Sequence, residues 1–314
     1  MKNIYIADQI APSIRTNLPT DGVQYWDSSN ITPETESKID IVWGSDQKLQ
    51  AMLKQPNQIK WIQSYSAGVD YFPLETLKQQ NIALTNTSGI HSESIAESVA
   101  MYALYFSRQM EQINKMRQAS DWSLHPSMDS LQTLSKMNWL IFGTGHIGSQ
   151  IAKIAQAFGG HTIGVNHSGH AAEYFNQNIS ISDYNLLAPT ADIVVNILPL
   201  TTETTHFYNY DFFQQFKHLF LFINVGRGKS VHTEALQQAI HNGNVDHAAL
   251  DVFETEPLPQ DSILWSEPNI LITPHNSAVS HNLNHDAQTI FIENLRKYLN
   301  QEYLTNEVDL IKGY

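Results

Sequence analysis

A glycine-rich turn between an apolar run and an amphipathic segment is the first part of this sequence that could do chemistry. Residues 139–142 lead directly into Gly143-Thr144-Gly145-His146-Ile147-Gly148, and apolar residues continue at helical spacing after it. In a strand, turn and helix of this form, the glycines allow a tight turn, close approach to a pyrophosphate and close helix packing. The helix N-terminus adds N–H donors. The alternative, a glycine turn that binds nothing, is disfavoured by this context. The predicted dinucleotide-binding residues of the turn are Gly143, Gly145, His146, Ile147 and Gly148.

The end of the next predicted strand bears on which dinucleotide binds. An acidic residue about 20 positions after the turn usually accepts hydrogen bonds from the adenosine ribose and repels a 2′-phosphate. Here Asn166 takes that place, and His167 and Ser168, which can donate to a phosphate, follow it. The sequence therefore favours NADP(H) over NAD(H). Because no Lys or Arg is adjacent, a polar loop that accepts either cofactor is the alternative.

Three further segments place polar side chains at the ends of predicted strands, where an open α/β sheet binds its ligands. They are residues 223–228, 250–259 and 272–275, which read INVGRG, LDVFETEPLP and ITPH. With these segments the sequence resembles the D-isomer-specific 2-hydroxyacid dehydrogenases over nearly the whole chain. The likeness also includes four shorter segments, namely residues 61–70, residues 94–97, Leu198-Pro199-Leu200-Thr201 and the terminal Gly313-Tyr314.

The resemblance implies a fold, an activity and an assembly. The expected fold is α/β, with a Rossmann-type dinucleotide-binding domain at 97–281 inserted in a smaller flavodoxin-like α/β substrate domain made from 1–96 and 282–314. The expected activity is reversible NAD(P)H-dependent reduction of a 2-oxo acid to a D-2-hydroxy acid, which makes the chain an oxidoreductase. The expected assembly is a homodimer.

The family's catalytic residues fall on Arg227, Glu256 and His275. Reduction of a 2-oxo acid needs a proton for the carbonyl oxygen, and His275 is the expected donor, since a carboxylate partner such as Glu256 favours the charged imidazolium. Arg227 stays charged and offers a fork to the substrate carboxylate and carbonyl. Glu254 is the rival for the role of Glu256. Because the motif places the acid directly before Pro257, we expect Glu254 to be a solvated loop carboxylate.

The resemblance extends both binding sites beyond these residues. It implies that backbone N–H groups around Ala67, Gly68 and Val69 hold the substrate carboxylate, together with Arg227. It also implies that Asp251 contacts the nicotinamide carboxamide. The other cofactor-binding residues expected from it are Leu198, Pro199, Thr204, Val225, Gly226 and Ser277.

The elements that must position these residues follow from alternation of short apolar runs with helical stretches, which is typical of parallel sheets. The expected strands are residues 4–7, 39–43, 59–64, 82–85, 138–142, 161–166, 192–198, 219–225, 247–252 and 270–273. One long helix is expected from about 94 to 116, followed by a connection at 122–130, and an amphipathic helix from about 284 to 300 closes the fold.

Composition narrows the function further. The 314 residues contain 18 Lys and Arg against 31 Asp and Glu, a formal charge of −13, and no cysteine. The acidic balance disfavours nucleic acid and anionic membranes as partners. Lack of cysteine excludes a thiol nucleophile and thiolate metal sites, and no HExxH pair suggests another metal site. No leader or long apolar run is visible, so a cytoplasmic location is expected.

Three questions stay open from the sequence. The substrate could be hydroxypyruvate, glyoxylate or a branched-chain oxo acid. A 3-phosphoglycerate dehydrogenase is a second enzyme interpretation, although no cationic residue is adjacent to residues 66–71 to bind a phosphate. A dinucleotide-sensing binding protein of the same fold is the non-catalytic alternative, and the presence of Arg227, Glu256 and His275 disfavours it.

Overall fold

The computed structural model describes residues 1–313, and Tyr314, the last residue of the terminal pair noted above, lies outside the described residues. Contacts divide the chain into two compact units. Unit 1 contains Met1–Ile90 and the residues from Ser280 onward, and unit 2 contains His91–Val279. These limits are near the expected domain ends at 96 and 282 without coinciding with them, and the domain division itself stays a prediction.

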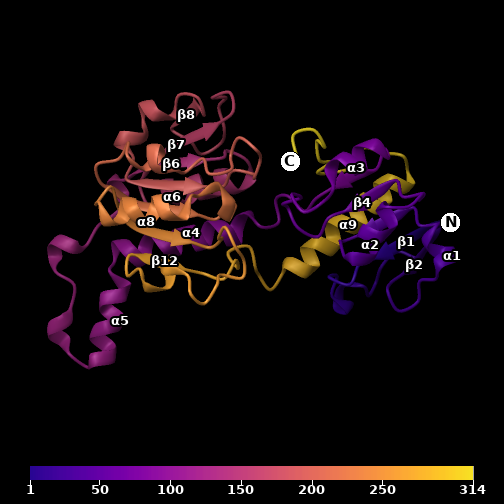
Figure 1. Ribbon diagram of the computed structural model, residues 1–314, viewed down its shortest axis with the longest axis horizontal. Coiled ribbons are helices and arrows are strands. Elements are labelled where there is room, and N and C mark those ends of the chain that lie inside the picture. Colours follow the sequence, from indigo (N-terminus) through magenta and orange to yellow (C-terminus); the bar gives the residue numbers. More distant parts are fainter. Residues whose placement is uncertain (314) are drawn as a thin grey trace. The chain divides into compact units, whose positions relative to one another are not determined.

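Unit 1 is built on a parallel sheet with the strand order β2-β1-β3-β4-β5 (Figure 1). Its strands are β1 (Lys2–Ile6), β2 (Val23–Trp26), β3 (Ile41–Trp43), β4 (Trp61–Gln63) and β5 (Ala83–Thr85). Its helices are α1 (Pro33–Glu36), α2 (Gln47–Leu53), α3 (Leu74–Gln79) and α9 (Leu283–Leu299). The expected strands and closing helix are confirmed, while β2 was missed because this edge strand is only partly buried and lacks a continuous apolar run.

The closing helix α9 packs its apolar side on this sheet. Phe291 is fully buried and stacks on Trp43, with ring centroids 4.2 Å apart. Leu295 is also fully buried, and the ring of Tyr298 stacks on Trp61. These contacts join the C-terminal segment to a sheet made by the first 85 residues, and therefore unit 1 is assembled from both ends of the chain.

Unit 2 contains a larger parallel sheet with the strand order β12-β11-β10-β9-β6-β7-β8. Its strands are β6 (Asn138–Phe142), β7 (His161–Asn166), β8 (Gln177–Ser180), β9 (Ile193–Asn196), β10 (Leu219–Asn224), β11 (Val245–Leu250) and β12 (Ile270–Ile272). Its helices are α4 (Ser92–Ser107), α5 (Met110–Ala119), α6 (His146–Ala157), α7 (Tyr210–Phe213) and α8 (Thr233–His241). All expected strands are present, and the unexpected β8 is a polar edge strand with no fully buried residue.

Helices cover both faces of the unit 2 sheet. Leu140 and Phe142 of β6 pack in one apolar cluster with residues of α7 and α8. The alternate residues Trp139 and Ile141 pack in a second cluster with residues of α4 and α6. Since successive side chains of a strand point to opposite faces, each face has its own core. This is the expected Rossmann-type α/β arrangement.

The expectation of one helix from 94 to 116 is wrong, because the chain breaks between α4 and α5. Gln109 adopts a left-handed conformation, with φ of 54°. The Arg108 guanidinium donates to the carbonyl of Gln132 at 3.3 Å, and the N–H of Gln132 donates to the carbonyl of Ser107 at 3.0 Å. The returning chain therefore satisfies the end of α4. Figure 1 shows α5 standing away from the sheet, and none of its residues is buried.

The ends of the unit 2 strands line up at one edge of the sheet. Phe142 of β6 is in register with Asn196 of β9, which is in register with Asn224 of β10. Asn224 is in register with Leu250 of β11, and Leu250 with Ile272 of β12. The glycine turn and the three polar segments after β10, β11 and β12 therefore leave the sheet at the same edge.

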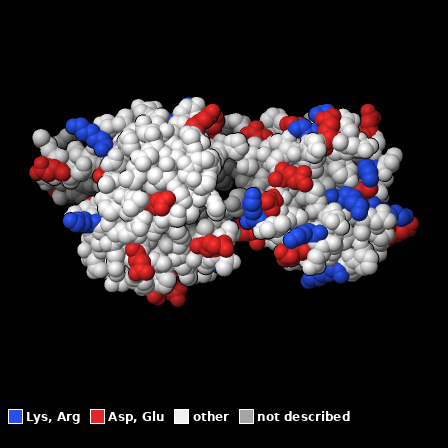
Figure 2. All heavy atoms as spheres, turned by 90° about the horizontal axis from the view of Figure 1, so that it is seen from above, with Lys and Arg blue, Asp and Glu red and all other residues white. Residues whose placement is uncertain are grey.

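On the face shown in Figure 2, Lys and Arg lie among Asp and Glu without forming a large basic patch. Within residues 1–313, no helix combines the length and apolar character needed to cross a bilayer.

Candidate active site

The glycine turn after β6 has the form that a pyrophosphate needs. A Cβ atom on Gly148 would lie 2.0 Å from the carbonyl oxygen of Gly143, so only glycine allows α6 to start this close to β6. A Cβ on Gly145 would meet nothing within 4 Å, so the backbone there is open to a ligand. Among the described residues, the N–H groups of His146 and Ile147 at the start of α6 have no acceptor. This turn fits the pyrophosphate of a dinucleotide.

Asn166, at the end of β7, uses its side chain to shape the loop that follows. Its Oδ1 accepts hydrogen bonds from the N–H groups of Gly169 at 2.7 Å and His170 at 3.1 Å. Its Nδ2 donates to Thr144 Oγ1 at 3.0 Å and to the carbonyl of His170 at 2.8 Å. The side chains of His167, Ser168 and His170 are exposed. The loop thus presents two imidazoles and a hydroxyl. His167 and Ser168 were expected from the sequence as donors to a phosphate, and His170 was not.

A buried amide network fixes the turns after β9 and β10. Asn196 Nδ2 donates to Asn224 Oδ1 at 2.8 Å and to Ser230 Oγ at 2.7 Å. Asn196 Oδ1 accepts from the N–H of Leu198 at 3.0 Å and from the Tyr208 hydroxyl at 3.1 Å. Burial raises the pKa of Tyr208, so this hydroxyl remains a neutral donor. This network was not expected from the sequence, although the asparagine that ends each of the two apolar strands is a signal for it.

The expected cofactor residues on these two turns are tied to the same network. The N–H of Val225 donates to the carbonyl of Asn196 at 3.2 Å, and the N–H of Gly226 donates to Asn224 Oδ1 at 3.1 Å. Thr204, five residues after Pro199, donates its hydroxyl to the Pro199 carbonyl at 2.7 Å. Leu198, Pro199, Thr204, Val225 and Gly226 therefore lie on two turns that share one hydrogen-bonded base.

Arg227 follows directly from the β10 turn. Asn224 Nδ2 donates to the carbonyl of Arg227 at 3.1 Å, and the Ser230 hydroxyl donates to the same carbonyl at 2.6 Å. The guanidinium donates through Nη1 to the carbonyl of Gly226 at 2.9 Å. The backbone of Arg227 is thus held from both sides.

His275 and Glu256 form a hydrogen-bonded pair. His275 Nδ1 lies 2.7 Å from Glu256 Oε2, and Glu256 Oε1 accepts the N–H of Phe253 at 2.9 Å. The His275 side chain is 51% exposed. Within residues 1–313, Nε2 of this ring has no hydrogen-bond partner. The carboxylate therefore orients the ring and leaves Nε2 as the atom that can transfer a proton.

Asp251 holds the turn that carries His275. Its carboxylate is fully buried, and Oδ1 accepts the Thr273 hydroxyl at 2.6 Å and the N–H of Asn276 at 3.0 Å. Oδ2 accepts the N–H of Ser277 at 3.0 Å. Tyr102 of α4 shares the Thr273 hydroxyl at 2.8 Å. Buried charge is tolerated where it is well hydrogen-bonded, and here those bonds fix the chain on both sides of His275.

Comparison with known proteins identifies the family of this chain. Residues 100–277 match the family described as D-isomer specific 2-hydroxyacid dehydrogenase, NAD binding domain. The chain is 32% identical over 283 residues to a glyoxylate/hydroxypyruvate reductase B of Klebsiella pneumoniae, covering 86% of this chain and 87% of the relative. The chain belongs to the D-isomer specific 2-hydroxyacid dehydrogenase family. The expected family is confirmed, and with it the classification as an NAD(P)-dependent oxidoreductase.

Two solved structures of similar proteins extend the likeness to the whole fold of this dehydrogenase. One is a D-isomer specific 2-hydroxyacid dehydrogenase family protein from Aeromonas salmonicida, 30% identical, with a TM-score of 0.85 and coverage of 98% of this chain and 99% of that one. The other is a phosphoglycerate dehydrogenase from Lactobacillus plantarum, 35% identical, with a TM-score of 0.60 and coverage of 98% and 100%.

Glu254 of this 2-hydroxyacid dehydrogenase is not the solvated carboxylate that we expected. Its Oε1 lies 2.6 Å from His206 Nε2, and its Oε2 accepts both the N–H of Thr233, at 3.0 Å, and the Thr233 hydroxyl. Burial by itself would raise the pKa of Glu254, but the hydrogen bonds from Thr233 and His206 outweigh it and lower the pKa. The expectation was wrong because these partners are distant in sequence.

The loop of unit 1 expected to hold the substrate carboxylate is braced through its carbonyl groups. The Asn86 amide donates to the carbonyl of Ala67 at 2.9 Å, and the Ser66 hydroxyl donates to that of Gly68 at 3.1 Å. The carbonyl of Val69 accepts the N–H of Phe72 at 3.0 Å. In the described part of the dehydrogenase, the N–H groups of Ala67, Gly68 and Val69 have no acceptor, so they are available to an anion.

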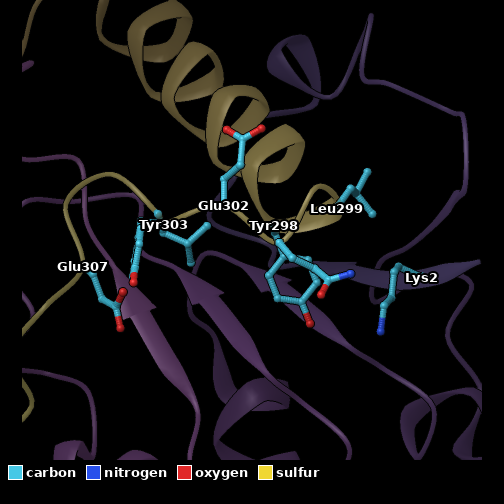
Figure 3. A pocket seen from close by; sticks show the side chains of 8 residues that line it. Lys2, Tyr298, Leu299, Glu302, Tyr303 and Glu307 are labelled. Atoms are coloured by element: carbon cyan, nitrogen blue, oxygen red, sulfur yellow. The ribbon is translucent and has the colours of Figure 1, made fainter.

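A hollow of about 610 Å³ lies elsewhere on unit 1, beside the end of α9 (Figure 3). Lys2 on its rim is paired with Asp40 at 2.7 Å, and Glu302 is paired with Arg296 at 3.1 Å. Tyr303 is almost fully exposed. None of the expected site residues of the dehydrogenase lines this hollow, so its shape alone does not make it the candidate active site.

Proposed function

We propose that this chain reduces a 2-oxo acid to a D-2-hydroxy acid with NADPH, reversibly. The observation that carries the proposal is the His275–Glu256 pair at 2.7 Å, in which the carboxylate takes one ring nitrogen and leaves the other for a substrate. Arg227 starts from the same sheet edge as this pair. Such an arrangement supplies a cationic acid and a permanent positive charge, which reduction of an anionic carbonyl compound requires.

The chain's own residues account for the proton and the charge in this reaction. A nicotinamide dinucleotide held by the glycine turn would supply the hydride that the carbonyl carbon takes. His275 Nε2 gives its proton to the carbonyl oxygen, Glu256 stabilises the imidazolium before transfer, and the ring regains a proton from solvent afterwards. Arg227 binds the carboxylate and carbonyl oxygens and lowers the energy of the developing alkoxide. The N–H groups of residues 67–69 are proposed to bind the substrate carboxylate.

Glyoxylate and hydroxypyruvate are the substrates we propose first. The Klebsiella pneumoniae relative, 32% identical, is named for both. The test is a panel of purified 2-oxo acids that includes these two and a branched-chain oxo acid, assayed with NADPH and with NADH. Reduction of at least one small oxo acid, with the D-hydroxy acid as product, is expected. No turnover with any of them, despite measurable dinucleotide binding, would favour the dinucleotide-sensing alternative.

We propose NADPH rather than NADH because no carboxylate stands at position 166. Asn166 leaves the loop uncharged there, and His167, Ser168 and His170 offer donors to a 2′-phosphate. Asn166→Asp adds a charge that repels a 2′-phosphate and should weaken NADPH binding about fivefold relative to NADH. His170→Ala should weaken only NADPH. Fluorescence titration of each cofactor measures both effects, and tighter NADH than NADPH binding by the parent enzyme would refute the preference.

A 3-phosphoglycerate dehydrogenase is the second candidate. The Lactobacillus plantarum phosphoglycerate dehydrogenase is 35% identical and covers 98% of this chain, which favours it. Oxidation of 3-phosphoglycerate, compared with oxidation of D-glycerate under the same conditions, distinguishes the two candidates. Faster turnover of the phosphorylated acid would replace the first proposal.

We also propose that the chain forms a homodimer through an arm made of α5 and the residues that follow it up to 130. No residue of α5 is buried. Two large apolar side chains of the arm, Trp122 and Met128, are 80% and 88% exposed. Apolar side chains this exposed in one segment are typical of an interface. Analytical ultracentrifugation should show a dimer for the parent and a weaker one for Trp122→Ser with Met128→Ser. A monomeric parent would refute the assembly.

A further inference from the structure

Unit 2 contains a second histidine–carboxylate pair for which the proposed reaction has no direct use. His206 Nε2 lies 2.6 Å from Glu254 Oε1, and the other oxygen of Glu254 accepts two hydrogen bonds from Thr233. Both side chains are only partly exposed, 44% for His206 and 32% for Glu254. A carboxylate with three donors is firmly placed, so its position in the fold needs explaining.

Glu254 connects three segments that carry expected site residues. It stands two positions before Glu256 in the turn after β11. Thr233 begins α8, six residues after Arg227, and so Glu254 joins the Glu256 turn to the Arg227 segment. His206 follows the β9 turn, which contains Leu198, Pro199 and Thr204. The N–H of His206 also donates to the carbonyl of Lys229 at 2.9 Å, which closes a second link to the Arg227 segment.

The Arg227 segment and the Glu256 turn are also in direct backbone contact. A Cβ atom on Gly228 would lie 1.9 Å from the carbonyl carbon and oxygen of Phe253. Phe253 is the residue whose N–H donates to Glu256 Oε1 at 2.9 Å. A shift of the turn against Gly228 would therefore move the group that holds Glu256. Glu254 is the next residue after Phe253. Its hydrogen bonds with Thr233 therefore act on the same turn.

The backbone of His206 indicates that its contact with Glu254 is a defined feature of the fold. The His206 backbone is left-handed, with φ of 52°, a conformation that only a few per cent of residues other than glycine adopt. The surrounding bonds from its ring and its N–H hold it there. A residue kept in an unfavoured conformation by two hydrogen bonds points to a defined local geometry rather than a freely moving surface loop.

We infer that Glu254 is a positioning residue, which with His206 and Thr233 holds the Glu256 turn so that Glu256 stays within hydrogen-bond distance of His275. The inference rests on the proposed function for its catalytic consequence. Glu254 touches neither His275 nor Arg227 in the hydrogen bonds of the described residues, and so it acts through the backbone of its own turn. Its removal should loosen Glu256, and a loosened Glu256 holds the His275 ring less well.

The test compares Glu254→Ala and Glu254→Gln with Glu234→Gln. Glu234 is exposed in the first turn of α8, next to Thr233. Glu234→Gln therefore removes one negative charge near Thr233 and leaves the His206–Glu254 pair intact. Glu254→Ala should lower kcat about tenfold while NADPH affinity by fluorescence titration changes less than twofold. The alkaline decline of reduction should move to lower pH. Glu254→Gln should retain part of the activity, because its amide oxygen can still accept from Thr233.

A second readout does not depend on turnover. NMR of histidine-labelled protein, with the His275 signals assigned by their loss in His275→Gln, should show that the His275 ring loses its proton at lower pH in Glu254→Ala than in the parent. His206→Ala should act in the same direction, and His206→Gln, which keeps a donor for Glu254, should act less. Near-ultraviolet circular dichroism shows whether each variant is folded.

The outcomes separate the inference from the proposed function. If the parent reduces no oxo acid, the proposed function fails, but the NMR titration still decides whether Glu254 positions the pair. If Glu254→Ala and Glu254→Gln match Glu234→Gln in kcat, pH profile and His275 titration, the positioning role is overturned. If they lose only thermal stability, with kcat and titration unchanged, Glu254 is structural and the inference is also overturned.

Discussion

The turn after β11 carries two carboxylates, two residues apart, that each bind a histidine from another segment. His275 lies 2.7 Å from Glu256, and His206 lies 2.6 Å from Glu254. Both histidines have left-handed backbones, with φ of 51° and 52°. The two pairs are therefore nearly the same in residue type, distance and backbone, and differ in what their other atoms bind.

The difference lies in the second oxygen of each carboxylate. Glu256 uses it for one backbone N–H within its own turn, from Phe253, whereas Glu254 uses it for two donors on α8, both from Thr233. Glu256 is bonded within its own turn and orients the ring of His275. Glu254 is bonded to α8 and therefore joins its turn to that helix. We propose that the same pair of side chains serves proton transfer in one place and positioning in the other.

Alanine at each histidine should separate these roles by the size of the loss. His275→Ala removes the proton donor, so kcat for reduction should fall about a thousandfold, with NADPH affinity nearly unchanged. His206→Ala removes one of the bonds to Glu254 and should cost about tenfold or less. Steady-state kinetics and fluorescence titration measure both. Equal losses of kcat in the two variants would contradict the separate roles proposed for His275 and His206.

Gly228→Ala tests the backbone contact that both pairs share. The new Cβ would lie 1.9 Å from the Phe253 carbonyl, so the Glu256 turn must move away from Arg227. Because a displacement of about 1 Å at a reacting group can cost a hundredfold, kcat should fall by about that factor. Thermal unfolding measured beside the kinetics shows whether the protein remains folded. A folded variant with parental kcat would mean that the two turns move independently.

Glutamine substitutions at Glu256 and Glu254 should change the pH dependence of reduction by different amounts. Glu256→Gln removes the carboxylate that lies 2.7 Å from His275 Nδ1, so reduction should decline at lower pH than in the parent. Glu254→Gln should move the decline less, because it acts only through the turn. The pH dependence of kcat from pH 5 to 10 measures both. A larger shift for Glu254→Gln would transfer the catalytic role to Glu254.

The sequence located the strand ends of unit 2 because its central strands are apolar runs that stop at a polar residue or a glycine. Edge strands lack that pattern, and so β2 and β8 were missed. The break between α4 and α5 was missed because neither glycine nor proline marks it. The side chains of Arg108 and Gln109 at the break donate to the carbonyl groups of Gln132 and Ser130, which are distant in sequence. Local pattern thus predicts elements better than their interruptions.

For the candidate site, the family resemblance identified Glu256 and His275 and their expected pairing, but not the partners of Glu254. Glu256 was found because the family's motif places its acid directly before Pro257, a local feature. The partners of Glu254 lie 48 and 21 residues away, so no local pattern connects His206 or Thr233 with it. Asp251 was expected to contact a cofactor, yet within the described residues its oxygens brace the His275 turn. Such links depend on strand register, which one sequence does not reveal.

The smallest expected effect concerns stability in acid. Because the pKa of Glu254 is lowered in the folded state, the unfolded state binds more protons as the pH falls below about 4.5. The stabilisation from this carboxylate is therefore present above that pH and is lost as the pH falls through the folded-state pKa. Glu254 is 32% exposed and partly screened, so we expect its contribution to be about 0.5 kcal/mol.

Urea denaturation of the parent, Glu254→Gln and Glu256→Gln at several pH values from 6 to 3.5 measures this contribution. The free energy of unfolding of Glu254→Gln should decrease less between pH 5 and 3.5 than that of the parent. Glu256→Gln is the matched control, since it leaves Glu254 and its bonds to Thr233 and His206 in place, and should retain the part of the decrease that belongs to Glu254. If Glu254→Gln follows the parent at every pH, the bonds from Thr233 do not stabilise the carboxylate, and Glu254 is no more firmly anchored than Glu256.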